Sequence, residues 1–81
     1  MDSQALYAIL AEALPGAELK INGGEGKYSV SVVGSVFEGL TSVKRQQFIY
    51  QFINEHINSG EIHAVTMQLQ TPSEKLVSEP T

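Results

Sequence analysis

The chain has 81 residues, with nine Asp or Glu against five Lys or Arg, and a formal net charge of −4. Its hydrophobic content of 42% suits one small globular domain and excludes both a disordered tail and a basic nucleic-acid-binding arm. It contains no cysteine, which excludes disulfides, cysteine nucleophiles and thiolate metal sites made by this chain alone.

The first half of the chain predicts a helix followed by a hairpin. Residues 2–14 form a helix that Asp2 or Ser3 can cap and that Pro15 and Gly16 end. Its apolar residues recur at helical spacing and form one stripe: Leu6, Ile9, Leu10, Ala13 and Leu14. Residues 17–21 and 27–33 alternate apolar and polar side chains, as half-buried strands do. A short glycine-rich loop, 22–26, joins these strands, so they should pair antiparallel.

The second half predicts a long helix, a third strand and a short last helix. The connector 34–40 has an apolar side, made by Val36, Phe37 and Leu40, and should pack against the domain. Residues 42–58 form an amphipathic helix that Thr41 or Ser42 caps, and residues 61–70 form the third strand. The run from Thr71 to Glu74 matches a capping box with Pro72 at the first helical position, which predicts that another helix begins there.

This order of elements predicts an α+β domain with the sequence α-β-β-α-β-α. The second and third strands are joined through a helix, so they should lie parallel to each other. The expected architecture is a three-stranded mixed sheet with helices packed on one face. It forms a single domain over residues 1–76, followed by a flexible tail over residues 77–81.

Patterns for catalysis and phosphate binding are weak. The run Gly24 to Gly26 lacks the third glycine of a dinucleotide-binding loop, because position 29 is Ser29, and a strand follows it instead of a helix. The segment around Ser35 lacks the final glycine of a G-x-S-x-G nucleophile elbow. The acidic residues are scattered singly, so no acid–base pair is indicated. We therefore expect a protein that is not an enzyme.

The two histidines offer different chemistry. His56 lies in the last turn of the long helix, where the helix dipole favours a cation, which indicates a solvated surface residue. His63 begins the third strand on the same face as Val65. It is either a partly buried histidine whose nitrogens bond to backbone groups, or a metal ligand at the rim of the sheet. Glu61 has the same strand parity and could orient its ring.

Lys44 and Arg45, with Gln46 and Gln47, form the one concentrated basic and amide patch. This patch is either a solvated helix face or a binding surface. Both basic residues lie at the positive end of the helix dipole, which is locally unfavourable. Their position therefore indicates that they meet an acidic partner there.

The stretch from Val33 to Glu74 resembles the BolA family. Its matching motifs occur in this order: Phe37-x-Gly39, Val43-Lys44-Arg45, Tyr50, Ile62-His63-Ala64 and Thr71-Pro72-x-Glu74. With the first helix and the hairpin, the resemblance spans residues 1 to about 76 and is closest to the shorter bacterial IbaG-type branch. It implies a fold like the type II KH domain, in agreement with the predicted order of elements.

The resemblance also implies a function in iron handling and stress response. BolA-like proteins pair with monothiol glutaredoxins and share a bridging [2Fe-2S] cluster or exchange iron, as heterodimers of chains that are monomers alone. The family histidine corresponds to His63, which would be the metal ligand, while the partner and glutathione bring thiolates; the chain would hold no cluster alone. The partner would contact Phe37, Gly39, Lys44 and Arg45. Family members often place a second His or Cys ligand between the first two strands, but residues 22–27 contain neither.

An alternative function is that of a DNA-binding transcriptional regulator, since family members have also been described in this way. Lys44 and Arg45 would then contact the phosphates. The net charge of −4 and the single small basic patch predict weak, non-specific binding. The connector glycines, Gly34 and Gly39, are also five residues apart, unlike the G-x-x-G loop of nucleic-acid-binding KH domains.

No membrane or secretory segment is recognisable. The longest uninterrupted apolar stretch, from Ala5 to Ala11, is far shorter than the ~20 residues that span a bilayer, and no positive segment precedes it. The cytoplasm is therefore the default location, or an organelle matrix if a leader was trimmed.

Overall fold

The structure is a computed structural model that describes residues 1–78. Within this range, the elements follow the predicted order: α1 (Ser3–Ala13), β1 (Glu18–Gly24), β2 (Lys27–Val33), α2 (Ser42–Asn58), β3 (Ala64–Gln70) and α3 (Pro72–Ser78). A short 3₁₀ helix, Ser35–Phe37, lies in the connector between β2 and α2. No helix of the described residues is long and apolar enough to cross a membrane.

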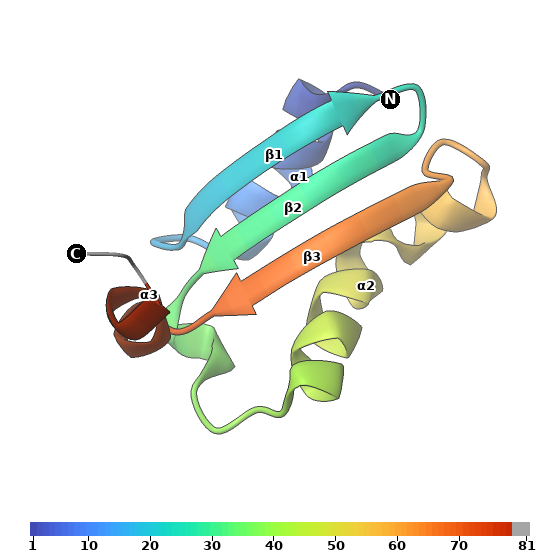
Figure 1. The fold of residues 1–81 in the computed structure, drawn as a ribbon. Helices are drawn as coiled ribbons and strands as arrows, with labels where there is room; N and C mark the ends of the chain where they lie inside the picture. Colours follow the sequence, from blue (N-terminus) through green and yellow to red (C-terminus); the bar gives the residue numbers. More distant parts are fainter. Residues whose placement is uncertain (79–81) are drawn as a thin grey trace.

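The three strands form one mixed sheet in the order β1-β2-β3. β1 pairs antiparallel with β2, and β2 pairs parallel with β3, as the hairpin and the helical crossover predict. Figure 1 shows α1 and α2 behind this sheet, whose other face is uncovered. α3 lies beside the ends of β2 and β3, and the ion pair between Lys75 Nζ and Glu18 Oε2, at 2.6 Å, connects it to β1.

The core lies between the sheet and the two long helices. The inward side chains of the central strand, Tyr28, Val30 and Val32, are buried there. Residues spaced four apart on each helix supply the facing layer, because this spacing places them on one side of the helix. The buried hydrophobic residues that form this core are Leu6, Leu10, Leu14, Tyr28, Val30, Val32, Phe37, Ile49, Ile53 and Ile62. The inward residues of β3, which is an edge strand, are only partly buried.

β1 extends past residue 21, where the alternation predicts its end. It runs to Gly24, because residues 22–24 pair in register with residues 27–29 of β2. The predicted loop over 22–26 is therefore reduced to the two residues Glu25 and Gly26, with φ angles of 55° and 82°. Positive φ at both central residues is typical of a type I′ turn, whose twist matches that of the paired strands.

β3 begins at Ala64, three residues later than the alternation predicts. The segment before it is still hydrogen-bonded to the last turn of α2, because the N–H of Ile62 donates to the carbonyl of His56 at 3.1 Å. The Ile62 side chain is also buried. Pairing with β2 starts where β2 itself starts, at Lys27 opposite Ala64. His63 therefore directly precedes the strand.

Side-chain caps begin the helices as predicted. Asp2 Oδ1 accepts a hydrogen bond from the N–H of Ala5 at 2.8 Å, and Thr41 Oγ1 accepts one from the N–H of Lys44 at 3.2 Å. The capping box at α3 is complete, since Thr71 and Glu74 each donate a backbone N–H to the other's side chain. The predicted tail, 77–81, overlaps α3 at residues 77 and 78, and residues 79–81 lie outside the described residues.

Candidate functional site

The backbone of His63 is held at the end of the sheet where the β1–β2 turn lies (Figure 1). Its N–H donates to the carbonyl of Gly26 at 2.7 Å, and the N–H of Ala64 donates to the same carbonyl at 3.0 Å. On the other side, Ile62 is buried in the core. Because the backbone is fixed on both sides of His63, its side chain starts from a fixed position, which favours a binding role.

The His63 imidazole is exposed and lies against the α-carbon of Gly26, where an added β-carbon would collide with the ring. Within residues 1–78, no hydrogen bond joins either ring nitrogen to another residue. Of the two alternatives from the sequence, a buried histidine satisfied by backbone groups is therefore wrong. The ring nitrogens are open to a ligand or a metal ion.

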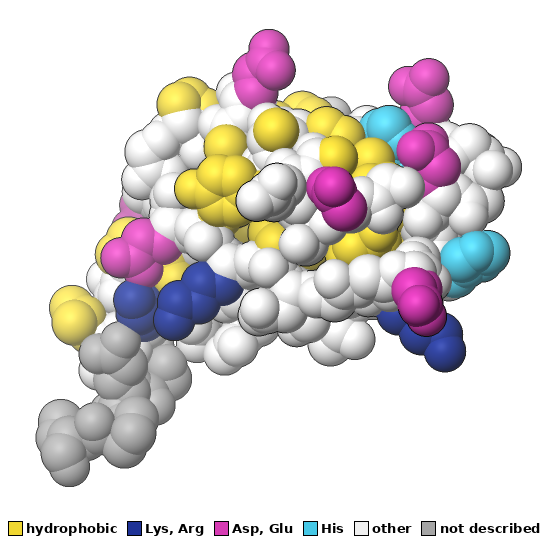
Figure 2. All heavy atoms as spheres, turned by 90° about the horizontal axis from the view of Figure 1, so that it is seen from above, with side chains coloured by type: hydrophobic (Ala, Val, Ile, Leu, Met, Phe, Trp, Pro, Cys, Tyr) yellow, Lys and Arg dark blue, Asp and Glu magenta, His cyan; other side chains and the backbone are white. Residues whose placement is uncertain are grey.

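The shared strand parity suggests that Glu61 orients the His63 ring. In the structure it does not, because the strand begins after both residues. Its carboxylate lies 3.0 Å from His56 Nδ1 and accepts a hydrogen bond from Ser59 Oγ at 3.0 Å. These bonds, first with His56 and then with Ser59, lower the pKa of Glu61 below its ordinary value. Figure 2 shows both histidine side chains at one end of the molecule, with acidic side chains nearby. The His56 ring is thus bonded to Glu61, whereas the ring nitrogens of His63 have no hydrogen bond among the described residues.

The donor set can contribute to a metal site but does not complete one. Among the described residues, no group of three or more His, Asp or Glu is placed to hold a metal ion, and the sequence contains no cysteine. The open imidazole of His63 fits the role of one ligand, since neutral imidazole binds iron and other borderline metals. Any metal group bound here therefore needs further ligands from another molecule.

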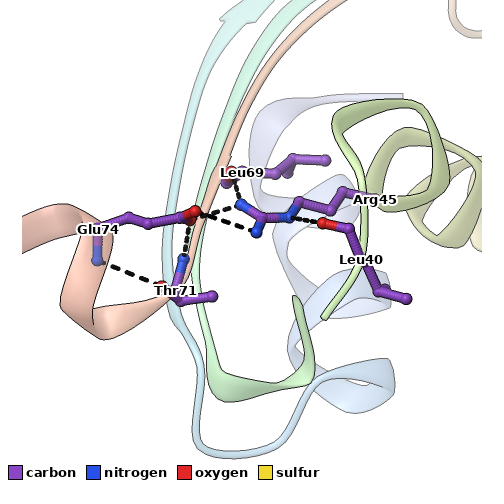
Figure 3. Close-up of polar contacts among 5 residues, drawn as sticks. All are labelled: Leu40, Arg45, Leu69, Thr71 and Glu74. Atoms are coloured by element: carbon purple, nitrogen blue, oxygen red, sulfur yellow. Dashed lines mark hydrogen bonds and ion pairs between the residues drawn. The ribbon is translucent and has the colours of Figure 1, made fainter. Parts of the chain in front are cut away.

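Arg45 is occupied within its own chain. Its Nε donates to the carbonyl of Leu40 at 2.9 Å, and its Nη1 donates to the carbonyl of Leu69 at 3.2 Å. Both Nη atoms donate to the carboxylate of Glu74, at 2.5 and 3.1 Å (Figure 3). The acidic partner that the sequence predicts at the start of this helix is thus Glu74. The partner-binding role of Arg45 remains a prediction, and Lys44 is the exposed member of the basic pair.

Phe37, which the sequence suggests as a partner-binding residue, lies in the core. Its side chain is 0% exposed, and its contact with a partner remains a prediction. The ring packs edge-on against Phe48, with 6.2 Å between centroids, and the Arg45 guanidinium lies 6.0 Å from the ring centroid. Gly39, with a φ of 80°, is exposed near the end of the same connector.

The structure places His63 apart from the other predicted site residues. Lys44 lies in the first turn of α2, whereas His63 follows the other end of this helix (Figure 1). A separation of roughly 20 Å follows from the rise of 1.5 Å per helical residue. A partner that contacts both residues would therefore have to extend along α2.

Two residues that contribute to these arrangements were not recognisable as site residues in the sequence. Glu74 has the capping box as its signal, but this motif predicts only the local bonds to Thr71 and not the ion pair with Arg45. Gly26 has no such signal, since nothing in a turn glycine indicates that a histidine ring from another element covers it.

Replacing Glu74 with glutamine should make the stability of the domain less dependent on pH. The bonds from Arg45, and then that from the backbone of Thr71, lower the pKa of Glu74 from its ordinary value of 4.5 to about 2. The ionised carboxylate therefore stabilises the folded state fully above pH 4.5, and this contribution is lost as the pH falls towards 2. We expect Glu74→Gln to have a lower Tm than the wild type at neutral pH, with the difference vanishing near pH 2.

Thermal unfolding followed by circular dichroism across this pH range measures the effect. Glu12→Gln, which changes an exposed acid of α1, is the matched control and should leave the pH dependence of Tm unchanged. A difference between Glu74→Gln and the wild type that persists undiminished at low pH would contradict the prediction.

This chain is similar to known proteins both in sequence and in fold. The family model described as BolA-like protein matches residues 8–74. A protein of Acinetobacter guillouiae, described as an uncharacterized protein in the rpoN-murA intergenic region, is 43% identical over 74 residues, which cover 91% of this chain and 89% of that protein. The acid stress protein IbaG of Escherichia coli (strain K12) is 34% identical over 74 residues, which cover 91% of this chain and 88% of that protein.

Among solved structures, the BolA domain of SufE1 from Arabidopsis thaliana is similar with a TM-score of 0.81 and 26% identity, covering 89% of this chain and 93% of that chain. The similarity covers most of both chains and confirms the predicted α+β fold.

Proposed function

Because the chain belongs to the BolA-like family, we propose that it is a non-enzymatic adaptor that pairs with a monothiol glutaredoxin in [2Fe-2S] cluster or iron handling. The observation that carries this proposal is the His63 imidazole, which is exposed, held by its backbone at the end of the sheet, and unbonded at both nitrogens among the described residues. One relative is an acid stress protein, which supports a role in stress response. The proposal includes the cytoplasmic location that the sequence suggests.

His63 supplies one ligand in this proposal, and the thiolates of the glutaredoxin and of glutathione supply the others. The shared cluster is cargo between two proteins, which agrees with a chain that has no cysteine and no complete donor set of its own among residues 1–78. The two hydrogen bonds to Gly26 fix the backbone before the partner arrives. Less conformational entropy is then lost when the imidazole binds.

DNA binding, the alternative function, receives little support from the basic pair. The guanidinium of Arg45 is bonded to Glu74 and to two backbone carbonyls, so Lys44 is the member of this pair whose charge is open to a phosphate. Affinity for DNA depends on how many phosphates are neutralised. In a chain with a net charge of −4, we therefore expect binding to duplex DNA to be weak and non-specific.

Titration of a cluster-loaded monothiol glutaredoxin with this protein tests the proposal. The expected result is a saturable change in visible absorption and circular dichroism, with co-elution of the two proteins in size-exclusion chromatography. A gel-shift assay on duplex DNA at physiological salt is the parallel measurement and should show no sequence preference. An unchanged cluster spectrum without a complex, together with nanomolar sequence-selective DNA binding, would favour the alternative.

A further inference from the structure

Gly26 contacts His63 in two ways. Its carbonyl accepts the backbone N–H of His63, at 2.7 Å, and that of Ala64, at 3.0 Å. Its α-carbon also lies beside the Cδ2 edge of the imidazole, so that an added β-carbon would collide with Cδ2 and approach Cγ and Nε2 at 3.1 and 3.3 Å. Gly26 is buried although it lies in an exposed turn, which agrees with a histidine side chain lying against it. One residue therefore meets both the backbone and the side chain of the candidate ligand.

The contact with Gly26 matters because the His63 ring has no polar restraint among the described residues. An exposed imidazole without hydrogen bonds can occupy several rotamers, and binding a metal in one of them loses that freedom. Contact between the Cδ2 edge of the ring and the turn favours the rotamer that places this edge against Gly26. A side chain at position 26 would remove this rotamer and leave the imidazole chemically intact.

We propose that Gly26 is a positioning residue for His63, so that the β1–β2 turn contributes to the site by lacking a side chain and not by supplying a second ligand. The proposal deepens the proposed function, on which it rests for the role of His63 as a ligand. The contact between Gly26 and the ring does not depend on that role. The two parts are therefore tested by separate measurements.

Nuclear magnetic resonance of the isolated protein tests the contact. We expect a nuclear Overhauser effect between the Gly26 α-protons and His63 Hδ2, and a ring-current shift of these α-protons that His63→Ala removes and His56→Ala retains. In Gly26→Ala, the imidazole resonances of His63 should shift while those of His56 stay unchanged. Absence of the Overhauser effect together with unshifted His63 resonances in Gly26→Ala would overturn the proposal.

Gly16→Ala is the matched control for backbone strain. Gly16 has a φ of 86°, close to the 82° of Gly26, but a β-carbon there would meet nothing within 4 Å. Both variants therefore carry the same kind of strain, and only Gly26→Ala has the collision with the ring. The His63 resonances should remain at their wild-type positions in Gly16→Ala. Should Gly26→Ala not fold, the wild-type Overhauser effect and the α-proton shifts in His63→Ala still decide the question.

The cluster measurement tests the link to function. Mixed with a cluster-loaded monothiol glutaredoxin, Gly26→Ala should lose most of the spectral change that the wild type gives, and Gly16→Ala should keep it. A displaced ring with the full spectral change, in a protein whose His63→Ala variant lacks that change, would overturn the positioning role. A full spectral change in His63→Ala would instead overturn the proposed function and leave the measured contact in place.

Discussion

The wild type is expected to change the visible circular dichroism of a cluster-loaded monothiol glutaredoxin. His63→Ala should abolish this change, or should reduce the affinity that it reports at least about tenfold. The reason is that His63 offers the open imidazole of the chain, which has no cysteine to replace it. The fold should survive, because the side chain is exposed and has no hydrogen bond among residues 1–78. A far-ultraviolet spectrum and an unfolding curve of the variant check this condition.

The second histidine provides the control for this experiment. His56 lies at the same end of the molecule, but its Nδ1 is paired with Glu61 at 3.0 Å. His56→Ala should therefore retain the full spectral change with the glutaredoxin. Equal losses in the two variants would point to a general surface effect, and a full change in His63→Ala would show that this imidazole is not a ligand. If His63→Ala is unfolded, His63→Gln repeats the test with a side chain of similar size.

Phe37→Ala should destabilise the domain by about 3–5 kcal/mol, the usual cost of removing a buried phenyl ring. The ring is fully buried, packs edge-on against Phe48 and lies beneath the guanidinium of Arg45. A domain of 81 residues without disulfides has only a small stability to lose. We therefore expect a large fraction of the variant to be unfolded at room temperature, as measured by urea unfolding followed with far-ultraviolet circular dichroism.

The neighbouring residue separates this role in the core from a role in partner binding. Val36 precedes Phe37 in the same 3₁₀ helix and is 42% exposed, so Val36→Ala should change the free energy of unfolding by roughly 0.5 kcal/mol or less. If Phe37→Ala were as stable as the wild type but bound the glutaredoxin more weakly, this result would contradict the expected loss of stability. It would support the prediction from the sequence that Phe37 contacts a partner.

Local sequence rules were sufficient for the helices and for the order of elements. The cap at Asp2, the cap at Thr41 and the box joining Thr71 to Glu74 all occur where the sequence predicts them. These bonds connect residues three positions apart, so the side chain and its partner are always close once the helix begins. The spacing of apolar residues likewise predicted which faces of α1 and α2 enter the core.

The strand boundaries depended on pairing between strands, which a single stretch of sequence does not contain. β1 reaches Gly24 because residues of β2 pair with it up to that point. Its last three residues, Asn22, Gly23 and Gly24, are of types that are depleted in strands. β3 begins only at Ala64, because its partner strand β2 begins at Lys27 and because the N–H of Ile62 is hydrogen-bonded to the last turn of α2. Alternation alone therefore gave the right strands with wrong ends.

By itself, the sequence determined the α+β order and the family, and it singled out His63 as the candidate ligand, since each depends on residue types and spacing along the chain. Only the tertiary structure decided that Phe37 lies in the core, that Arg45 pairs with Glu74 and that Gly26 supports the His63 ring. All three involve residues far apart in sequence, and the packing of the sheet against its helices brings them together. Whether a side chain faces solvent, an ion-pair partner or a backbone turn is a property of that packing, and residue type does not encode it.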